Sequence, residues 1–365
     1  MQKKVDKPFL IITLVLIVLG FVIFNSASLG LLARSGERFA NAALSQTVYG
    51  LFFGTIAMLV ASGINYKKWK KYSFYLFFAS VILSLLVFSP IGFEHGGAKR
   101  WIDIFGFSFQ PSQVLKIAFI IYLSAWLSGL KDKVKTFKWG LLPLIIIMGI
   151  ACVVIAIQPD TDTVIIIAVS GIALYLTAGG KWRHILILSL ILSVSLAFFA
   201  FSKPYILQRV KTFINQDENP LTSGYQIQQS LIAIGSGGIS GRGFGQSIQK
   251  FNFLPEPIGD SIFAVASEEF GFVGAVFIIL LFMAFSIAGL KIAVRTSDMF
   301  GRLLVVGIII QIISQSYLNI GAMLGVLPLS GNTLPFVSHG GTALLFTLAE
   351  VGIILNISRF QQKKS

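Results

Sequence analysis

Ten mostly apolar runs, each long enough to cross a lipid bilayer as a helix, divide this 365-residue chain. A spanning helix needs about 20 such residues, whereas the strands of an outer-membrane barrel are about 10 residues long and alternate in polarity. The sequence therefore predicts an all-α polytopic membrane protein with about ten transmembrane helices, forming a single integral membrane domain over residues 1–365. The predicted spans are 8–28, 43–63, 72–90, 110–129, 138–157, 162–179, 182–201, 260–290, 300–327 and 336–357.

The charges of the chain indicate how these spans are oriented. Only 12% of the residues are charged, about half the fraction in a typical soluble domain. If the N-terminus is cytoplasmic, 19 of the 29 Lys and Arg residues lie in or beside the cytoplasmic connections, as the positive-inside rule requires. The net charge of +14 is thus a topology signal, and no nucleic-acid partner is needed to explain it. Both termini are predicted to be cytoplasmic.

The unusual connections all fall on the outer side. Residues 202–259 form one long extracytoplasmic loop between the seventh and eighth spans, and their aromatic and apolar residues predict packing on the membrane face. Within this loop, residues 224–234 could form a short amphipathic or re-entrant helix. The glycine-rich stretch 235–245 has no Gly-Lys-Ser/Thr ending, so it is not a nucleotide-binding loop. It is either a flexible turn or a set of backbone amides that meets an anion.

Asp260 opens the eighth predicted span, at the outer rim of the membrane. A carboxylate next to apolar surface tends to have a raised pKa, which suits a general base. Asp is also a preferred N-cap residue, so Asp260 could instead cap the helix that follows it. The residues alone leave both alternatives open.

Ionisable residues inside spans are costly and usually face a polar interior. Glu268, Glu269 and Glu350 are such residues, and a structural role between helices is as reasonable for them as a catalytic one. Glu268 and Glu269 point about 100° apart on a helix, so they cannot share one site. Lys116 lies about one turn inside its span, after Gln110-Pro111-Ser112-Gln113. It either snorkels to the interface or, as we favour with Arg100 just outside, meets a phosphate.

The remaining candidates give weaker signals. Asp160 and Asp162 precede the sixth span, where one of them is expected to cap the helix, and a metal site would need more ligands than these two. His95, His184 and His339 show no metal-ligand spacing. Cys152 is the only cysteine, so an intramolecular disulfide is impossible.

Several stretches resemble the family of shape, elongation, division and sporulation (SEDS) proteins, which includes RodA and FtsW. The similarity runs in order along nearly the whole chain, which is more specific than any single motif. The stretch from Gln249 to Pro257 is similar to the division branch of the family. The matching stretches are Lys99-Arg100-Trp101, Gln110-Pro111-Ser112 with Lys116, Gln158-Pro159-Asp160, residues 224–245, Gln249-Lys250-Phe251-Asn252-Phe253-Leu254-Pro255-Glu256-Pro257, Asp260 to Val265 with Glu268-Glu269, and Leu334 to Gly341.

The resemblance implies a multi-pass protein of the bacterial cytoplasmic (inner) membrane with peptidoglycan glycosyltransferase activity. Such an enzyme polymerises lipid II, an undecaprenyl-diphosphate-linked disaccharide-peptide, for cell division or elongation. It also implies a partner, a class B penicillin-binding protein, and other division or elongation membrane proteins. The acid after Leu-Pro-Glu-Pro is the proposed catalytic residue of the family and corresponds to Asp260.

The implied chemistry assigns further roles. Diphosphate is a good leaving group, so the reaction needs a base and positive charge rather than an acid that protonates the leaving oxygen. Arg100, Lys116, Arg209 or a divalent cation (Mg²⁺ or Mn²⁺) would stabilise the charge that develops on the diphosphate. Gln226, Gln229 and Ser338 are candidates for hydrogen bonds to sugar or phosphate.

The sequence departs from the family pattern near several of these residues. The family commonly has Glu at Gln113, His-Thr at Ile258-Gly259 and Tyr at His339. Two other functions stay open. A lipid II flippase would need polar groups through the bilayer, and few are present. A non-catalytic scaffold for the penicillin-binding protein would tolerate changes beside Asp260.

Overall fold

A computed structural model describes residues 4–95, 98–104, 107–202, 204–214, 223–329 and 331–361 of the chain. In these ranges, eight helices are long and apolar enough to cross a membrane, and two shorter apolar helices accompany them. Each predicted span corresponds to one of these helical segments, so the predicted fold class is confirmed. The segments are α1 (Lys7–Leu32), Gly36–Gly63, α4 (Lys67–Leu85), α5 (Pro111–Leu130), α6 (Leu142–Ile157), α7 (Thr161–Thr177), α8 (Trp182–Ser202), α11 (Ile262–Arg295), α12 (Met299–Met323) and α13 (Gly341–Ser358).

The second segment consists of α2 (Gly36–Leu44), a π-helical stretch (Ser45–Phe52) and α3 (Phe53–Gly63). Short helical turns follow α4 and α5, at Leu86–Phe88, Lys131–Lys135 and Phe137–Leu141.

Polar residues define where several spans begin. Asp6 caps α1 by accepting a hydrogen bond from the Phe9 amide at 3.1 Å. Asp160 caps α7, where it accepts from the Thr163 amide at 3.2 Å and from the Thr163 hydroxyl at 2.9 Å. One of the two predicted alternatives for the Asp160–Asp162 pair, helix capping, is therefore confirmed for Asp160. A capping side chain satisfies amides that have no partner within the helix.

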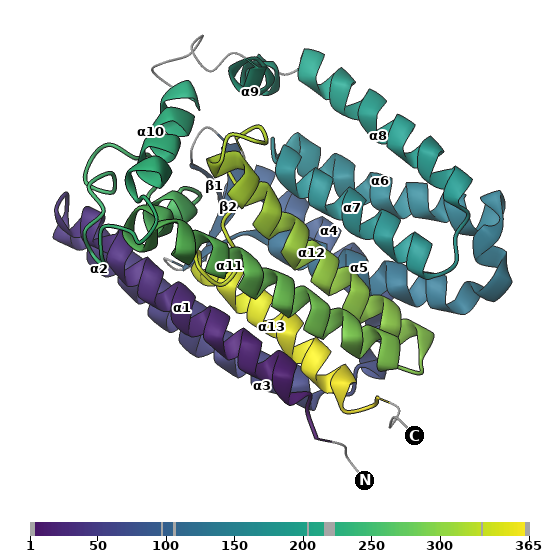
Figure 1. Ribbon diagram of the computed structural model, residues 1–365. Helices are drawn as coiled ribbons and strands as arrows, with labels where there is room; N and C mark the ends of the chain where they lie inside the picture. The colour runs from purple at the N-terminus through teal and green to yellow at the C-terminus, as the bar shows by residue number, and fades with distance from the viewer. Residues whose placement is uncertain are drawn as a thin grey trace.

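Both ends of the described chain lie at the same end of the bundle (Figure 1). The Asp6 amide donates to the Ser358 hydroxyl at 3.1 Å, and the Asp6 carboxylate is 3.9 Å from Arg295 at the end of α11. This end is called the terminal end below. The start of α11, and therefore Asp260, lies at the other end, which is called the site end.

The site end carries structure that the sequence did not predict. Three antiparallel strands, β1 (Gly92–His95), β2 (Ala98–Ile104) and β3 (Phe107–Phe109), form a small sheet in the order β1-β2-β3. The long connection 202–259 contains two helices, α9 (Pro204–Ile214) and α10 (Ser223–Ser236). Helix α10 confirms the short helix predicted at 224–234, whereas α9 was not predicted. Residues 203 and 215–222 of this connection lie outside the described residues.

The connection between α12 and α13 enters the bundle rather than running over its surface. Leu334, Phe336 and Val337 are buried, with at most 3% of each side chain exposed. A Cβ atom added at Gly20 of α1 would lie 2.2 Å from the Phe336 carbonyl oxygen. Glycine at position 20 is what allows this close approach between α1 and the connection. The segment 331–339 is therefore held among helices, beside the turn that carries Asp260.

Candidate functional site

Asp260 lies in a tight turn just before α11. The amides of Gly259 and Ser261 both donate to the Glu256 carbonyl, at 3.0 and 3.3 Å. Ser261, not Asp260, is the N-cap residue of α11, so the alternative that Asp260 caps this helix is wrong. The Asp260 side chain is half-buried and accepts a long hydrogen bond of 3.5 Å from the Ser261 hydroxyl.

Three consecutive carbonyls of this turn are held by the last third of the chain. The Ile258 carbonyl accepts from the His339 amide at 2.7 Å, and the Gly259 carbonyl accepts from the Ser338 hydroxyl at 2.6 Å. The Asp260 carbonyl accepts from the Asn319 side chain at 2.7 Å. The backbone under the Asp260 carboxylate is therefore fixed by contacts from α12 and from the connection that follows it.

The surroundings of Asp260 bring the pKa of its carboxyl group close to neutral pH. Burial raises the pKa of Asp260 to about 7, and the nearby Glu256 acts in the same direction. The Gln226 side chain and the Arg209 guanidinium act in the opposite direction and favour the carboxylate. A carboxyl group with a pKa near neutral can accept a proton and release it again under ordinary conditions.

Arg209 is the predicted cation that the structure places at this site. Its guanidinium lies 3.6 Å from the Asp162 carboxylate, and 29% of the side chain is exposed. Asp162 also accepts a hydrogen bond from the Gly331 amide at 3.1 Å. This contact connects α9, α7 and the segment 331–339. Arg209 thus keeps part of its side chain exposed while an ion pair with Asp162 fixes its position.

The other two predicted cations face elsewhere. Arg100, on β2, donates to the carbonyls of Gln158 and Pro159, so it holds the turn between α6 and α7. Lys116 has only 3% of its side chain exposed and donates to the Gln315 side chain at 2.8 Å. Lys116 therefore does not snorkel to the interface. That either residue contacts a phosphate stays a prediction.

The remaining candidates have the following positions. The Gln226 side chain donates to the Ser261 hydroxyl at 3.0 Å, and Gln229 lies one turn further along α10 and is half-buried. Ser338 uses its hydroxyl to hold the Gly259 carbonyl and to accept from the Leu334 amide at 2.8 Å. These two hydrogen bonds within the protein are enough to explain the position of Ser338, and no bound substrate is needed to account for it.

At two of the departures from the family pattern, the side chain itself has identifiable contacts. The Gln113 side chain donates to the Gln110 side chain at 3.3 Å, within the start of α5. The His339 ring is stacked against Phe24 with 5.9 Å between ring centroids. His339 reaches the Asp260 turn through its backbone amide, so its side chain is not what contacts Ile258.

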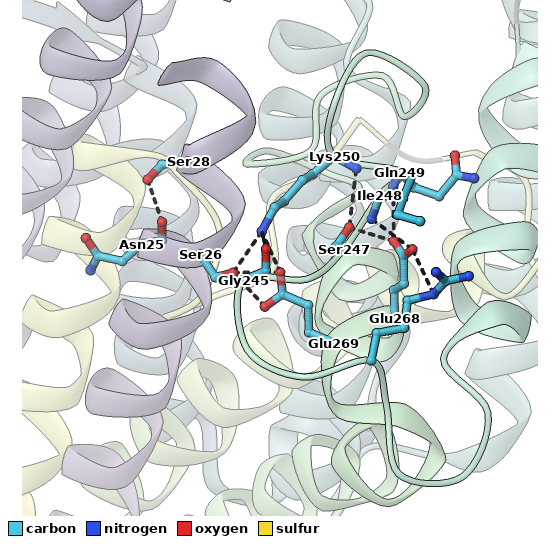
Figure 2. Close-up of polar contacts among 11 residues, drawn as sticks. Asn25, Ser26, Ser28, Gly245, Ser247, Ile248, Gln249, Lys250, Glu268 and Glu269 are labelled. Carbon is cyan, nitrogen blue, oxygen red and sulfur yellow. Dashed lines mark hydrogen bonds and ion pairs between the residues drawn. The ribbon is translucent and has the colours of Figure 1, made fainter. Parts of the chain in front are cut away.

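Glu268 and Glu269 contact different residues of one loop, as Figure 2 shows. Glu268 accepts from the Ser247 hydroxyl at 2.6 Å and from the Ile248 amide at 3.0 Å. Glu269 accepts from Lys250 at 2.7 Å and from the Ser26 hydroxyl of α1 at 2.6 Å. The two carboxylates are thus used separately, as their spacing required, and their contacts fit the structural alternative.

The glycine-rich stretch packs against a kink in α11. Gly271 has a backbone φ of 66°, which side-chain-bearing residues rarely adopt, and the helix changes direction there. The amides of Arg242 and Gly243 donate to the carbonyls of Glu268 and Glu269, both at 3.0 Å, and the Gly238 carbonyl accepts from the Phe272 amide at 2.8 Å. These contacts favour a structural turn over an anion-binding loop.

A cavity of about 150 Å³ opens among α6, α7, α8 and α9. Its lining is almost entirely apolar and extends from residues deep in α6 to the start of α7 and to α9. The lining residues are Ile145, Met148, Gly149, Cys152, Val153, Ala156, Thr161, Val164, Ile191, Leu192, Ser195 and Ile206. Thr161 directly precedes Asp162, and Ile206 lies three residues before Arg209 on α9, so the cavity ends close to the polar site.

A metal ion would need ligands that the described part of the chain does not bring together. No group of three or more His, Cys, Asp or Glu side chains there is arranged to hold one. The carboxylates around Asp260 therefore do not form a complete metal site by themselves. The predicted divalent cation stays a prediction.

The sequence did not identify Asn319, which contacts the Asp260 backbone, or Asp162 as the partner of Arg209. A signal for Asn319 is present, however. Gln311, Gln315 and Asn319 follow one another at intervals of four residues in an otherwise apolar span. Residues four apart share one face of a helix, so this spacing predicts a polar stripe that faces the protein interior.

These features define a multi-span membrane protein with a titratable carboxylate and an arginine at one end of its bundle. A family model described as "Cell cycle protein", covering FtsW, RodA and SpoVE proteins, matches residues 7–363. The chain belongs to this family, as its sequence motifs indicated.

Named relatives resemble the chain over nearly its full length. Stage V sporulation protein E of Bacillus subtilis (strain 168) is 37% identical, and the alignment covers 98% of each chain. A probable peptidoglycan glycosyltransferase FtsW of Geobacter sp. (strain M18) is 36% identical over 97% of this chain and 96% of its own. The fold is shared with a chain from the structure described as "Structural coordination of polymerization and crosslinking by a peptidoglycan synthase complex". That match has a TM-score of 0.81, covers 98% of this chain and 99% of the other, and shows 24% identity.

Proposed function

We propose that this protein is a peptidoglycan glycosyltransferase of the bacterial inner membrane, which polymerises lipid II with Asp260 as general base. The observation that carries the proposal is the position of Asp260. It is a half-buried carboxyl group with a pKa of about 7, set beside Arg209 and Gln226 at the site end of a membrane-spanning bundle. The names of relatives that share the whole chain support the same activity.

The orientation in the membrane follows from the charges. Lys131, Lys133, Lys135 and Lys138 lie exposed in the short connection after α5, and the positive-inside rule assigns such connections to the cytoplasm. The terminal end is then cytoplasmic, and Asp260 faces the outer side, where glycan strands are made. This agrees with the predicted cytoplasmic termini.

The proposed reaction joins a sugar hydroxyl to the anomeric carbon of the donor sugar. The hydroxyl oxygen forms a bond to that carbon, the bond from the carbon to the diphosphate oxygen breaks, and undecaprenyl diphosphate leaves. The proton of the hydroxyl passes to the Asp260 carboxylate. Because the leaving group is a weak base, no acid has to protonate it. A base of pKa near neutral is well suited to a proton transfer at ordinary pH.

The developing negative charge on the diphosphate needs a positive group, and Arg209 is best placed to supply it. Its guanidinium is partly exposed and acts electrostatically on Asp260. A single planar guanidinium group can donate two parallel hydrogen bonds to two oxygens of one phosphate. Asp162 would keep Arg209 oriented when no substrate is bound. A divalent cation that arrives with the diphosphate would supply further positive charge to the leaving group.

The apolar cavity among α6, α7, α8 and α9 fits a lipid-linked substrate. A polyprenyl chain in this cavity would remain in an apolar environment, while its diphosphate would lie near Arg209. The lipid would therefore hold the reacting sugar at the membrane surface beside Asp260.

A class B penicillin-binding protein is the proposed partner, because polymerised strands must be cross-linked. A chain with the same fold comes from a peptidoglycan synthase complex. Other division or elongation membrane proteins are expected to join such a complex.

Purified protein with fluorescent lipid II provides the test. The wild-type protein, alone or with its penicillin-binding partner, should form glycan polymer, and Asp260→Asn should fold but lose activity by at least about 100-fold, as expected for the loss of a general base. Glu94→Gln, an exposed carboxylate on β1 at the same end of the bundle, is the control and should retain activity.

Two results would point to the alternatives. Translocation of lipid II across liposomes without polymer formation would indicate a flippase. Stimulation of the penicillin-binding partner by Asp260→Asn as strong as by wild type, with no polymer from either, would indicate a scaffold.

A further inference from the structure

We propose that Asn319 is a positioning residue that sets the location of the Asp260 carboxylate by joining two loops. This inference rests on the proposed role of Asp260 as general base. Asn319 does not contact substrate in this proposal. It acts through the backbone of the residue that does.

The Asn319 side chain makes one bond to each loop. Its amide nitrogen donates to the Asp260 carbonyl at 2.7 Å and to the Asn332 carbonyl at 2.7 Å. Both neighbours are acceptors, so the NH₂ group must face them, and its two protons are both used. The Asn319 side chain is fully buried, so water does not compete for these bonds.

Among the residues that the structure describes, the oxygen of the same amide makes no contact of this kind, so the two bonds of the nitrogen are what Asn319 contributes here. In the described part of the chain, the Asn319 Oδ1 atom is buried and has no hydrogen-bond donor. A buried acceptor without a partner is costly, and an apolar residue of similar size would avoid that cost. The function of the amide nitrogen explains why the protein tolerates the unsatisfied oxygen.

The neighbouring contacts make Asn319 part of a larger frame. One turn earlier on α12, Gln315 donates to the Thr333 carbonyl at 3.0 Å and accepts from Lys116 at 2.8 Å. The segment 331–339 in turn holds the Ile258 and Gly259 carbonyls through His339 and Ser338. Of these contacts, the Asn319 bond is the one made to the Asp260 residue itself.

The frame matters because proton transfer depends on distance. A displacement of about 1 Å at a reacting group can reduce the rate by about 100-fold. Loss of the Asn319 bonds would release the Asp260 carbonyl and separate the two loops, while Arg209 and the apolar cavity would remain. Catalysis should therefore fall, whereas substrate binding should change little.

The test compares Asn319→Leu and Asn319→Asp with Asn356→Leu in the full-length protein. Leucine removes both donors, and aspartate keeps the volume while donating at most one hydrogen bond. Asn356 is the control at the terminal end, because it is also buried and its side chain also donates to a backbone carbonyl, that of Ser62 at the end of α3, at 2.8 Å. Steady-state polymerisation of lipid II and hydrogen exchange of peptides covering 254–262 and 331–339 are measured for each variant.

We expect both Asn319 variants to lower kcat by about 10- to 100-fold with KM for lipid II within about twofold. Exchange should rise in both peptides in these variants. Asn356→Leu should lower the thermal midpoint without either change. Unchanged exchange in the two peptides, or raised exchange with an unchanged kcat, would overturn the proposal. If wild-type protein failed to polymerise lipid II, the proposed function would be wrong, whereas the exchange data would still decide whether Asn319 joins the loops.

Discussion

Asp260 combines partial burial with one acidic and one basic neighbour, and its pKa of about 7 follows from that balance. A general base must be unprotonated. We therefore expect kcat/KM to fall about tenfold per pH unit below pH 7 and to level off above it. A pH–rate profile from pH 5 to 9 measures this. A profile that is flat between pH 5 and 8 would remove Asp260 as the titrating base.

The same pKa can be checked without activity. Because folding raises the pKa of Asp260 from 3.8 to about 7, the folded protein holds a proton between these values that the unfolded chain releases. The stabilising contribution is complete below pH 4 and is lost as the pH rises through 7. Asp260→Asn should therefore raise the thermal midpoint relative to wild type more at pH 8 than at pH 5.

Lys116 shows where reasoning from single residues reaches its limit. The sequence placed Lys116 correctly near the start of α5. Whether its side chain reaches the membrane interface or is buried depends only on how α5 is rotated about its axis. That rotation is set by α12, whose Gln315 accepts its hydrogen bond. The polar stripe of Gln311, Gln315 and Asn319 was readable in the sequence and predicts which face of α12 meets such partners.

At the scale of elements, the loop 237–250 and helix α11 depend on the ion pair of Lys250 and Glu269. Both side chains are almost fully buried, and their charged atoms are 2.7 Å apart. Removing one partner leaves a buried charge without compensation. Lys250→Met or Glu269→Leu alone should therefore destabilise the protein by about 3–5 kcal/mol.

The double variant Lys250→Met/Glu269→Leu should recover much of this loss, because no charge then remains buried. Arg242→Ala is the control. The Arg242 side chain is 38% exposed beside Glu268, and partly exposed ion pairs contribute about 0–1 kcal/mol. Thermal unfolding in detergent measures all four variants. A double variant less stable than either single variant would show that the pair is not an isolated charge interaction.

The helical spans could be predicted because length and apolar character decide them. The small sheet and α9 could not. The strands are three to seven residues long, too short for a distinct alternating pattern. Helix α9 is amphipathic but follows α8 after a single residue, so no clear boundary in the sequence separates the span from a surface helix.

At the scale of the whole molecule, the proposed orientation places Asp260 and the terminal end on opposite sides of the membrane. Cys152 is the only cysteine, so Cys152→Ser provides a background for single-cysteine labelling. Asn252→Cys at the site end and Lys133→Cys after α5 both lie at exposed positions. An impermeant maleimide applied to intact spheroplasts should label Asn252→Cys and not Lys133→Cys. The reverse result would invert the topology.

The site itself was predicted unevenly. The family resemblance pointed to Asp260, and the need for positive charge named Arg209 among three cations. In the structure, Arg209 and Gln226 both act on the Asp260 carboxyl group. The positions of Arg100 and Lys116 in the sequence pointed to phosphate binding. In the structure, Arg100 donates to backbone carbonyls and Lys116 donates to Gln315. Contacts between residues far apart in sequence decided this outcome, such as that of Asp162 with Gly331, and no local pattern reveals them.

The carbonyls of Ile258, Gly259 and Asp260 are held by residues 319, 338 and 339, which the ribosome adds some sixty to eighty positions later. A nascent chain that has already inserted α11 therefore contains Asp260, the proposed base, but lacks the residues that hold the backbone of its turn. Polymerisation would then begin only after the connection between α12 and α13 has been synthesised and packed, so that shorter chains in the bilayer would be inactive.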